Sequence, residues 1–180
     1  MPEKVLIVTA SLRAGSNSDA LAEAFARGAK EAGHTVEVVS LKGKQIAFCR
    51  GCLACLKTGR CVIDDDAVPL AEKVGQADVV VFATPVYYYG LSGQLKTLLD
   101  RCNCLYGHTY SFRTVYLLAS AAEAEDSAVE GSVKGLQGWV DCFEKARLTG
   151  IIFAGGVNNP GDIRNHPALE KAYEAGKSIR

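Results

Sequence analysis

The sequence predicts a doubly wound α/β domain, in which helices cover both faces of a five-stranded parallel sheet. Short apolar runs without alternation indicate strands that are buried on both sides. Segments with helical spacing of apolar residues lie between these runs. Strand and helix alternate along the chain, which favours right-handed crossovers and a parallel sheet. Among the arrangements that this alternation allows, we expect the strand order 2-1-3-4-5.

The expected elements follow from these two patterns. The apolar runs predict strands at 5–8, 36–39, 79–83, 115–119 and 151–154, of which the second is the weakest. Helical spacing predicts helices at about 21–32, 67–76, 91–99, 129–143 and 167–179, the last with a proline in its first turn. A cysteine-bearing excursion at about 41–66 has no strong strand pattern, and long excursions of this kind are usually functional.

Size and charge limit what the protein does. A chain of 180 residues, 48% hydrophobic, is expected to form a single domain spanning 1–180. Its 20 basic and 20 acidic residues give no net charge, so we expect no nucleic-acid or membrane partner. No apolar run approaches the ~20 residues of a membrane helix. The start of the sequence lacks a signal pattern, which predicts a cytoplasmic protein.

The loop after the first strand has the chemistry of an anion site. Residues 9–18 contain four hydroxyl side chains, Asn17 and Arg13, and they lead directly into a helix. Free backbone amides at a helix start attract phosphate, and an arginine adds a charge-assisted contact. The alternative is that Asn17 or Ser18 only caps the helix. Because the P-loop lysine and the three-glycine dinucleotide pattern are absent, a monophosphate ligand fits best.

The loop after the third strand suits a flat aromatic ligand. Tyr87, Tyr88 and Tyr89 are adjacent, between Pro85 and Gly90. In a doubly wound sheet, ligands bind beyond the carboxyl ends of the strands where the strand order reverses. Tyrosine has an apolar face and a polar tip, which suits an isoalloxazine ring. A dimer interface is the alternative, and alternate side chains could serve both roles.

In these segments the chain resembles the NADPH-dependent FMN reductase family. The resemblance covers most of the chain, with its core at 11–18, 77–78, 84–90 and 94–101. It implies a flavodoxin-like three-layer sandwich, noncovalent FMN, NAD(P)H as electron donor, and a homodimer or homotetramer. It also implies two sets of FMN contacts: Ser11, Arg13, Ser16, Asn17 and Ser18 at the phosphate, and Pro85, Val86, Tyr87, Tyr88 and Gly90 at the ring. After the fourth strand, residues 120–126 depart from the glycine-rich turn that family members often have.

Four cysteines form a compact motif within the excursion. Cys49, Cys52, Cys55 and Cys61 follow a C-x2-C-x2-C-x5-C spacing, which allows four thiolates to surround an iron-sulfur cluster. The motif is similar to that of the iron-sulfur flavoproteins, which carry a [4Fe-4S] cluster close to FMN. Zinc and reactive free thiols are alternatives. We expect the acidic run 64–66 to cap the following helix and to face water.

These observations support three hypotheses for function. The first is an FMN-dependent oxidoreductase that takes hydride from NAD(P)H and reduces a quinone, a flavin or another small acceptor. Because the flavin carries this chemistry, no catalytic side chain is expected. The second is an electron carrier that passes electrons from a ferredoxin through [4Fe-4S] to FMN. The third is a flavin-free scaffold with structural cysteines.

Overall fold

The computed structural model describes residues 1–180 and contains the predicted parallel sheet. Its five parallel strands are β1 (Lys4–Thr9), β2 (Thr35–Ser40), β3 (Val79–Tyr87), β5 (Thr114–Ser120) and β6 (Arg147–Ala154). They are arranged in the order β2-β1-β3-β5-β6, which is 2-1-3-4-5 when only these five strands are counted. The prediction is therefore confirmed. A two-residue strand, β4 (Gly90–Leu91), adds a short antiparallel hairpin to the end of β3.

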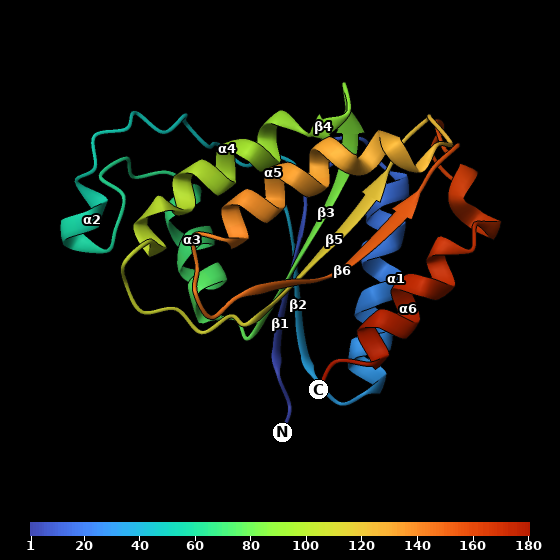
Figure 1. The fold of residues 1–180 in the computed structure, drawn as a ribbon, viewed down its shortest axis with the longest axis horizontal. Helices are drawn as coiled ribbons and strands as arrows, with labels where there is room; N and C mark the ends of the chain where they lie inside the picture. Colours follow the sequence, from blue (N-terminus) through green and yellow to red (C-terminus); the bar gives the residue numbers. More distant parts are fainter.

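Helices cover both faces of the sheet. One face carries α1 (Asn17–Glu31) and α6 (Ala168–Lys177), and the other carries α3 (Ala67–Gln76), α4 (Gly93–Arg101) and α5 (Glu130–Val140) (Figure 1). The excursion after β2 contains one short helix, α2 (Cys55–Thr58), and no strand. Three 3-10 turns complete the chain: η1 (Cys102–Leu105), η2 (Asp126–Val129) and η3 (Asp162–Asn165). The architecture is a flavodoxin-like three-layer sandwich.

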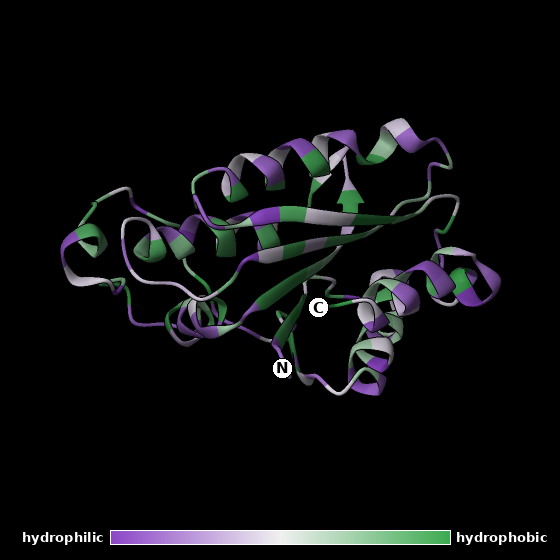
Figure 2. Cartoon of the chain, turned by 60° about the horizontal axis from the view of Figure 1, so that its bottom comes forward, coloured by the Kyte–Doolittle hydropathy of each residue, from purple (hydrophilic) through white to green (hydrophobic).

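The sheet separates two apolar cores. Leu6, Val8 and Phe82 face α3, α4 and α5, whereas Val5 and Ile7 face α1 and α6. Figure 2 shows apolar strands between helices that are striped with polar and apolar residues. The expectation that every run is buried on both faces holds for β1 and for most of β3 and β5. It is wrong for β2 and β6, because these edge strands have a side that no neighbouring helix covers completely.

Two glycines let α1 and α6 approach closely. A methyl group on Gly28 would lie 2.0 Å from the Tyr173 carbonyl oxygen, and one on Gly176 would lie 2.2 Å from the Phe25 carbonyl oxygen. Neither position therefore tolerates a side chain without movement of a backbone. The close approach seals the core beneath Phe25, which is completely buried.

None of the helices has the length and apolar character needed to cross a bilayer; the longest, α1, has 15 residues.

Candidate functional site

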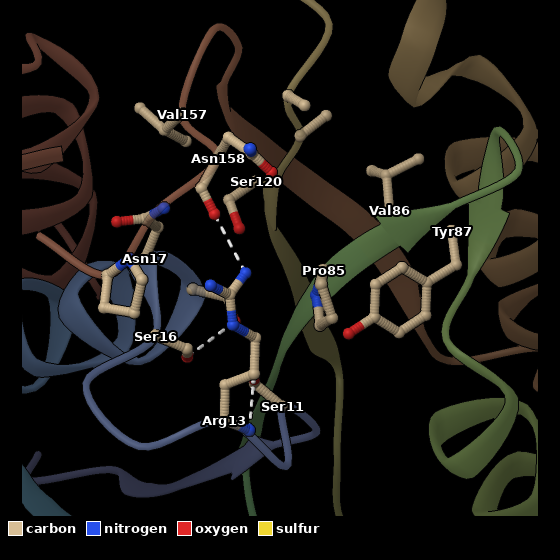
Figure 3. Close-up of a pocket in the computed structure, with 14 residues that line it drawn as sticks. Ser11, Arg13, Ser16, Asn17, Pro85, Val86, Tyr87, Ser120, Val157 and Asn158 are labelled. Carbon is tan, nitrogen blue, oxygen red and sulfur yellow. Dashed lines mark hydrogen bonds between the residues drawn. The ribbon is translucent and has the colours of Figure 1, made fainter. Parts of the chain in front are cut away.

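A hollow lies at the carboxyl edge of the sheet, between the loops that follow β1, β3, β5 and β6 (Figure 3). It encloses about 210 Å³, less than the ~300–1,000 Å³ of pockets that bury most of a drug-sized ligand. It therefore suits one end of an elongated ligand and leaves the other end at the surface. Eight of the predicted FMN contacts line it: Ser11, Arg13, Ser16, Asn17, Ser18, Pro85, Val86 and Tyr87.

The start of α1 forms one wall of the hollow. Ser16 is the N-cap residue, and its hydroxyl accepts a hydrogen bond from the Asp19 amide at 3.1 Å. The next two amides, of Asn17 and Ser18, have no acceptor within the chain. The Ser18 hydroxyl is buried 3.3 Å from that of Ser16. Free amides and hydroxyls together at a helix start are the groups that bind phosphate.

The loop after β6 forms a second wall, and side chains from the first loop hold it in place. Arg13 donates from Nη1 to the Asn158 carbonyl at 2.9 Å (Figure 3). Asn17 donates from Nδ2 to the Asn159 carbonyl at 3.0 Å and accepts from the Ile163 amide at 3.4 Å. The amide group of Asn17 is therefore used mainly to join two loops, whereas the Arg13 guanidinium keeps further donors for a ligand.

The β3–β4 hairpin forms the opposite wall. The Thr84 hydroxyl donates to Ser92 Oγ at 3.1 Å and accepts from the Ser92 amide at 3.3 Å, which fixes the base of the hairpin. Above this base the ring of Tyr87 lies beside Pro85 (Figure 3), and Tyr87 is 46% exposed. Gln94, at the start of α4, donates to the Ala10 carbonyl at 2.6 Å and so ties the hairpin side to the first loop.

The turn of this hairpin is strained. Tyr88 and Tyr89 connect the paired residues Tyr87 and Gly90, and both have positive φ, 49° and 62°. A two-residue turn with these angles normally contains Asn and Gly, because a bulky side chain is disfavoured there. Tyr88 is fully exposed at the tip and, like Gly90, does not line the hollow. The structure thus brings Tyr87 to the site and points Tyr88 away from it.

Helix α5 supports the strained turn from behind. A methyl group on Gly131 would lie 2.2 Å from the Tyr89 carbonyl oxygen. The absence of a side chain at Gly131 therefore allows the turn to rest directly on the helix.

Sequence reasoning missed part of the lining. Ser120, Ala121 and Ala122 line the hollow, although their loop departs from the family pattern. Val157 and Asn158 also line it, from the loop after the last strand. Only the topology could have indicated these loops, because every parallel strand of the sheet ends at this edge. The loop residues themselves have no distinctive chemistry.

Asp19 is the acidic group nearest the helix start. Burial raises its pKa, and hydrogen bonds with Ser16 and Thr9 offset this only in part, so that the pKa remains above its ordinary value. A raised pKa makes the carboxyl group easier to neutralise when a second negative charge approaches.

The four motif cysteines line one small cavity at the other end of the molecule. Cys49 and Cys52 are exposed, and Cys55 and Cys61 are half-buried; all four face a cavity that Arg101 and Asn103 also line. Asn103 Nδ2 lies 3.3 Å from Cys55 Sγ. No three Cys, His, Asp or Glu side chains converge closely enough to hold a single metal ion. The motif is therefore gathered, but its sulfur atoms do not form a mononuclear site.

The other three cysteines lie outside this cavity. Cys102 and Cys104 are buried in the core, and burial is the main reason that the pKa of each thiol is raised. Cys142 is exposed near the end of α5. None of the seven cysteines forms a disulfide.

Known proteins resemble the chain in sequence and in fold. An iron-sulfur flavoprotein of Archaeoglobus fulgidus is 34% identical, over 98% of this chain and 78% of that protein. One of Methanosarcina thermophila is 29% identical, over 93% and 85%. An NAD(P)H:quinone oxidoreductase from Methanothermobacter marburgensis has the same fold, with a TM-score of 0.75 at 22% identity over the full length of both chains. Residues 3–143 match the model of the NADPH-dependent FMN reductase family. The chain therefore belongs to this family and is an FMN-dependent oxidoreductase.

Proposed function

We propose that the hollow holds FMN, with the phosphate against the start of α1 and the ring against the β3–β4 hairpin. One observation carries this proposal: five residues of the loop 11–18 line the same hollow as Pro85, Val86 and Tyr87. They lie far apart in the sequence and have the two kinds of chemistry that FMN requires. Ser120 to Ala122 supply small side chains between them.

The phosphate end is supported by free donors rather than by a net positive field. The residues that supply these donors line the hollow: Asn17 and Ser18 with unpaired amides, Ser11, Ser16 and Ser18 with hydroxyls, and Arg13 with its remaining guanidinium donors. The helix dipole contributes at most ~2 kcal/mol, whereas micromolar binding requires ~8 kcal/mol. Contacts with the ribityl chain and the ring must therefore supply most of the binding energy.

The proposed position of the isoalloxazine ring accounts for the small volume of the hollow. A ring stacked near Tyr87 would extend past the hollow and keep one face accessible to a nicotinamide or an acceptor. Bound FMN supplies the hydride and electron chemistry. The residues of this chain bind and orient it, and no side chain is assigned as a catalytic acid or base. We propose NAD(P)H as the donor and a quinone, a flavin or another small molecule as the acceptor.

We also propose that the protein is a single-domain, cytoplasmic homodimer or homotetramer. Seven free cysteines are consistent with a reducing compartment. The fully exposed Tyr88 at the tip of the hairpin supports association with another copy near the site.

Comparing FMN with riboflavin tests the assignment of the phosphate end. The unmodified protein should bind FMN more tightly than riboflavin, measured by flavin fluorescence. Arg13→Gln should weaken FMN binding by about 10–100-fold, because a hydrogen bond to a charged group is worth ~1.5–3 kcal/mol. Riboflavin binding should hardly change. Arg27→Gln, on the exposed side of α1, is the matched control and should bind both flavins normally.

Two results would contradict this assignment. Equal affinity of the unmodified protein for FMN and riboflavin would mean that no phosphate site exists. A parallel loss of both flavins in Arg13→Gln would mean that Arg13 acts only by holding the loop at Asn158.

A specific observation favours a second role, as an iron-sulfur electron carrier. All four motif cysteines line one cavity, and two relatives are iron-sulfur flavoproteins. The donor set fits a [4Fe-4S] cluster, which requires four thiolates spread around a core larger than one ion. We propose that Cys49, Cys52, Cys55 and Cys61 hold this cluster, which would supply one-electron transfer.

Anaerobic purification tests the second role. Iron and acid-labile sulfide should each approach four per chain, and replacement of Cys52 and Cys55 by serine should remove them. Cys142→Ser, which changes an exposed cysteine outside the motif, should retain both. A protein that carries flavin without iron or sulfide would leave the reductase role alone.

A further inference from the structure

A buried arginine lies beneath the cysteine cavity. The side chain of Arg101, at the end of α4, is fully buried, although arginine is almost never buried unless it is paired. Its Nη1 and Nη2 form two parallel bonds with the carboxylate of Asp65, at 2.7 and 2.9 Å. The expectation that the acidic run 64–66 faces water is therefore wrong for Asp65, because this pair withdraws it from solvent.

The same guanidinium joins the two arms of the cysteine excursion. Nη1 also donates to the Ala47 carbonyl at 2.8 Å, and Nη2 donates to the Ile63 carbonyl at 2.9 Å. Ala47 precedes Cys49 by two residues, and Ile63 follows Cys61 by two. One side chain thus fixes the segments that enter and leave the motif, and it anchors both to α4. Figure 1 shows the excursion carrying α2 beyond the end of α4.

One donor of Arg101 is left over. Nε is buried and has no hydrogen-bond partner. An unsatisfied buried donor costs about 1–3 kcal/mol, so an acceptor placed beside this Nε would stabilise the folded protein. Arg101 lines the cavity of the four cysteines, whereas Asp65 does not. The positive member of the ion pair therefore borders the cavity that the four cysteines line.

The neighbouring groups agree with a sulfur acceptor. On the same wall Asn103 donates to Cys55 Sγ. Asp100, the other charged residue on this wall, is paired with Lys96 at 2.7 Å. The wall formed by α4 and η1 thus offers N–H donors to the cavity.

We propose that Arg101 is a positioning residue for the cluster: it holds the two arms of the excursion together and offers its free Nε–H to the cavity that the four cysteines line. This inference rests on the proposed iron-sulfur role. Hydrogen bonds to sulfur and nearby positive charge stabilise the more negative, reduced state of such a cluster. Arg101 is therefore expected to affect both the retention of iron and the midpoint potential.

The test compares three variants after anaerobic reconstitution with ferrous iron and sulfide. Arg101→Lys retains a charge but loses the planar fork. The double variant Arg101→Met with Asp65→Leu removes the charge pair together, which is often neutral for stability. Arg113→Gln is the control, because Arg113 is exposed and donates to the carbonyls of residues 110–112. Melting temperature and circular dichroism verify folding of each variant.

The expected results distinguish the effect of Arg101 on the position of the two arms from the effect of its charge. The double variant should lose iron to a chelator about 10–100-fold more readily than the unmodified protein, with a more negative midpoint potential. Arg101→Lys should also lose iron readily, but its midpoint potential should lie between those of the double variant and the unmodified protein. Arg113→Gln should match the unmodified protein in both measurements.

Two failures are distinguishable. If the unmodified protein incorporates no iron and sulfide, the iron-sulfur role fails and the proposal for Arg101 falls with it. If the unmodified protein is loaded, and a folded double variant retains iron equally well at the same potential, only the role of Arg101 is overturned.

Discussion

Replacing Gly131 by alanine should loosen the flavin-side hairpin. The new methyl group would lie 2.2 Å from the Tyr89 carbonyl oxygen, so the turn must retreat by about 0.8 Å to reach the shortest contact found in proteins. Overpacking of this kind costs ~1–3 kcal/mol, and the gain in helix propensity returns at most ~1 kcal/mol. We expect a net loss of about 1–2 kcal/mol, which corresponds to a melting temperature lower by ~2–8 °C. FMN affinity should fall, because Tyr87 moves with the turn.

Gly138→Ala is the matched control on the same helix. Nothing lies within 4 Å of a methyl group at Gly138, so only helix propensity acts and the protein should gain up to ~1 kcal/mol. The assay is thermal unfolding of both variants, with and without FMN, together with flavin titration. Equal stabilisation by the two substitutions, with unchanged FMN affinity, would show that α5 does not support the turn.

Three further predictions concern other parts of the molecule. Replacing Tyr88 and Tyr89 by Asn and Gly should raise the free energy of unfolding by at least ~1 kcal/mol in urea titrations, because it relieves two strained φ angles; no gain would mean that the turn is relaxed. Gly28→Ala should cost more than ~1 kcal/mol, because its methyl group meets the Tyr173 carbonyl, whereas Arg27→Ala should stay within ~0.5 kcal/mol. Burial raises the pKa of Asp65, but hydrogen bonds from Arg101 and two backbone amides together lower it by more, so that the pKa lies below its ordinary value. Its stabilising contribution is therefore complete above pH ~4 and is lost as pH falls below that value. Asp65→Asn should cost ~3–5 kcal/mol at pH 7, and a deficit that does not shrink in acid would argue against this linkage.

Much of the fold could be predicted from periodicity. Strand runs and helical spacing define the sheet and its covering helices because burial dictates both patterns, and the helix expected at 67–76 matches α3. The edge strands were harder to describe. Ile151 lies in an apolar run and yet is 45% exposed, because a run of apolar residues does not reveal which strand lacks an outer neighbour.

The site could be predicted where the chemistry is local. Ser16 and Ser18 lie in a hydroxyl-rich loop before a helix, and this pattern can be recognised in the sequence. Ala121 and Val157 could not be identified, because they contribute only shape and position. The role of Arg101 was equally hidden: its partner Asp65 lies 36 residues away, and no local pattern distinguishes a buried arginine from an exposed one.

The contact between α1 and α6 has a consequence for how the chain folds. The two helices are separated by more than 130 residues, and the Tyr173 hydroxyl binds Glu31 across that separation. The apolar side chains of Leu21 and Phe25 therefore lack the helix that completes their core until residues 168–177 have been synthesised. The other side of the sheet can close earlier, because α3, α4 and α5 precede β6. During translation the apolar face that α6 covers is therefore expected to stay exposed until synthesis is almost complete. Chaperones would be most needed in this interval.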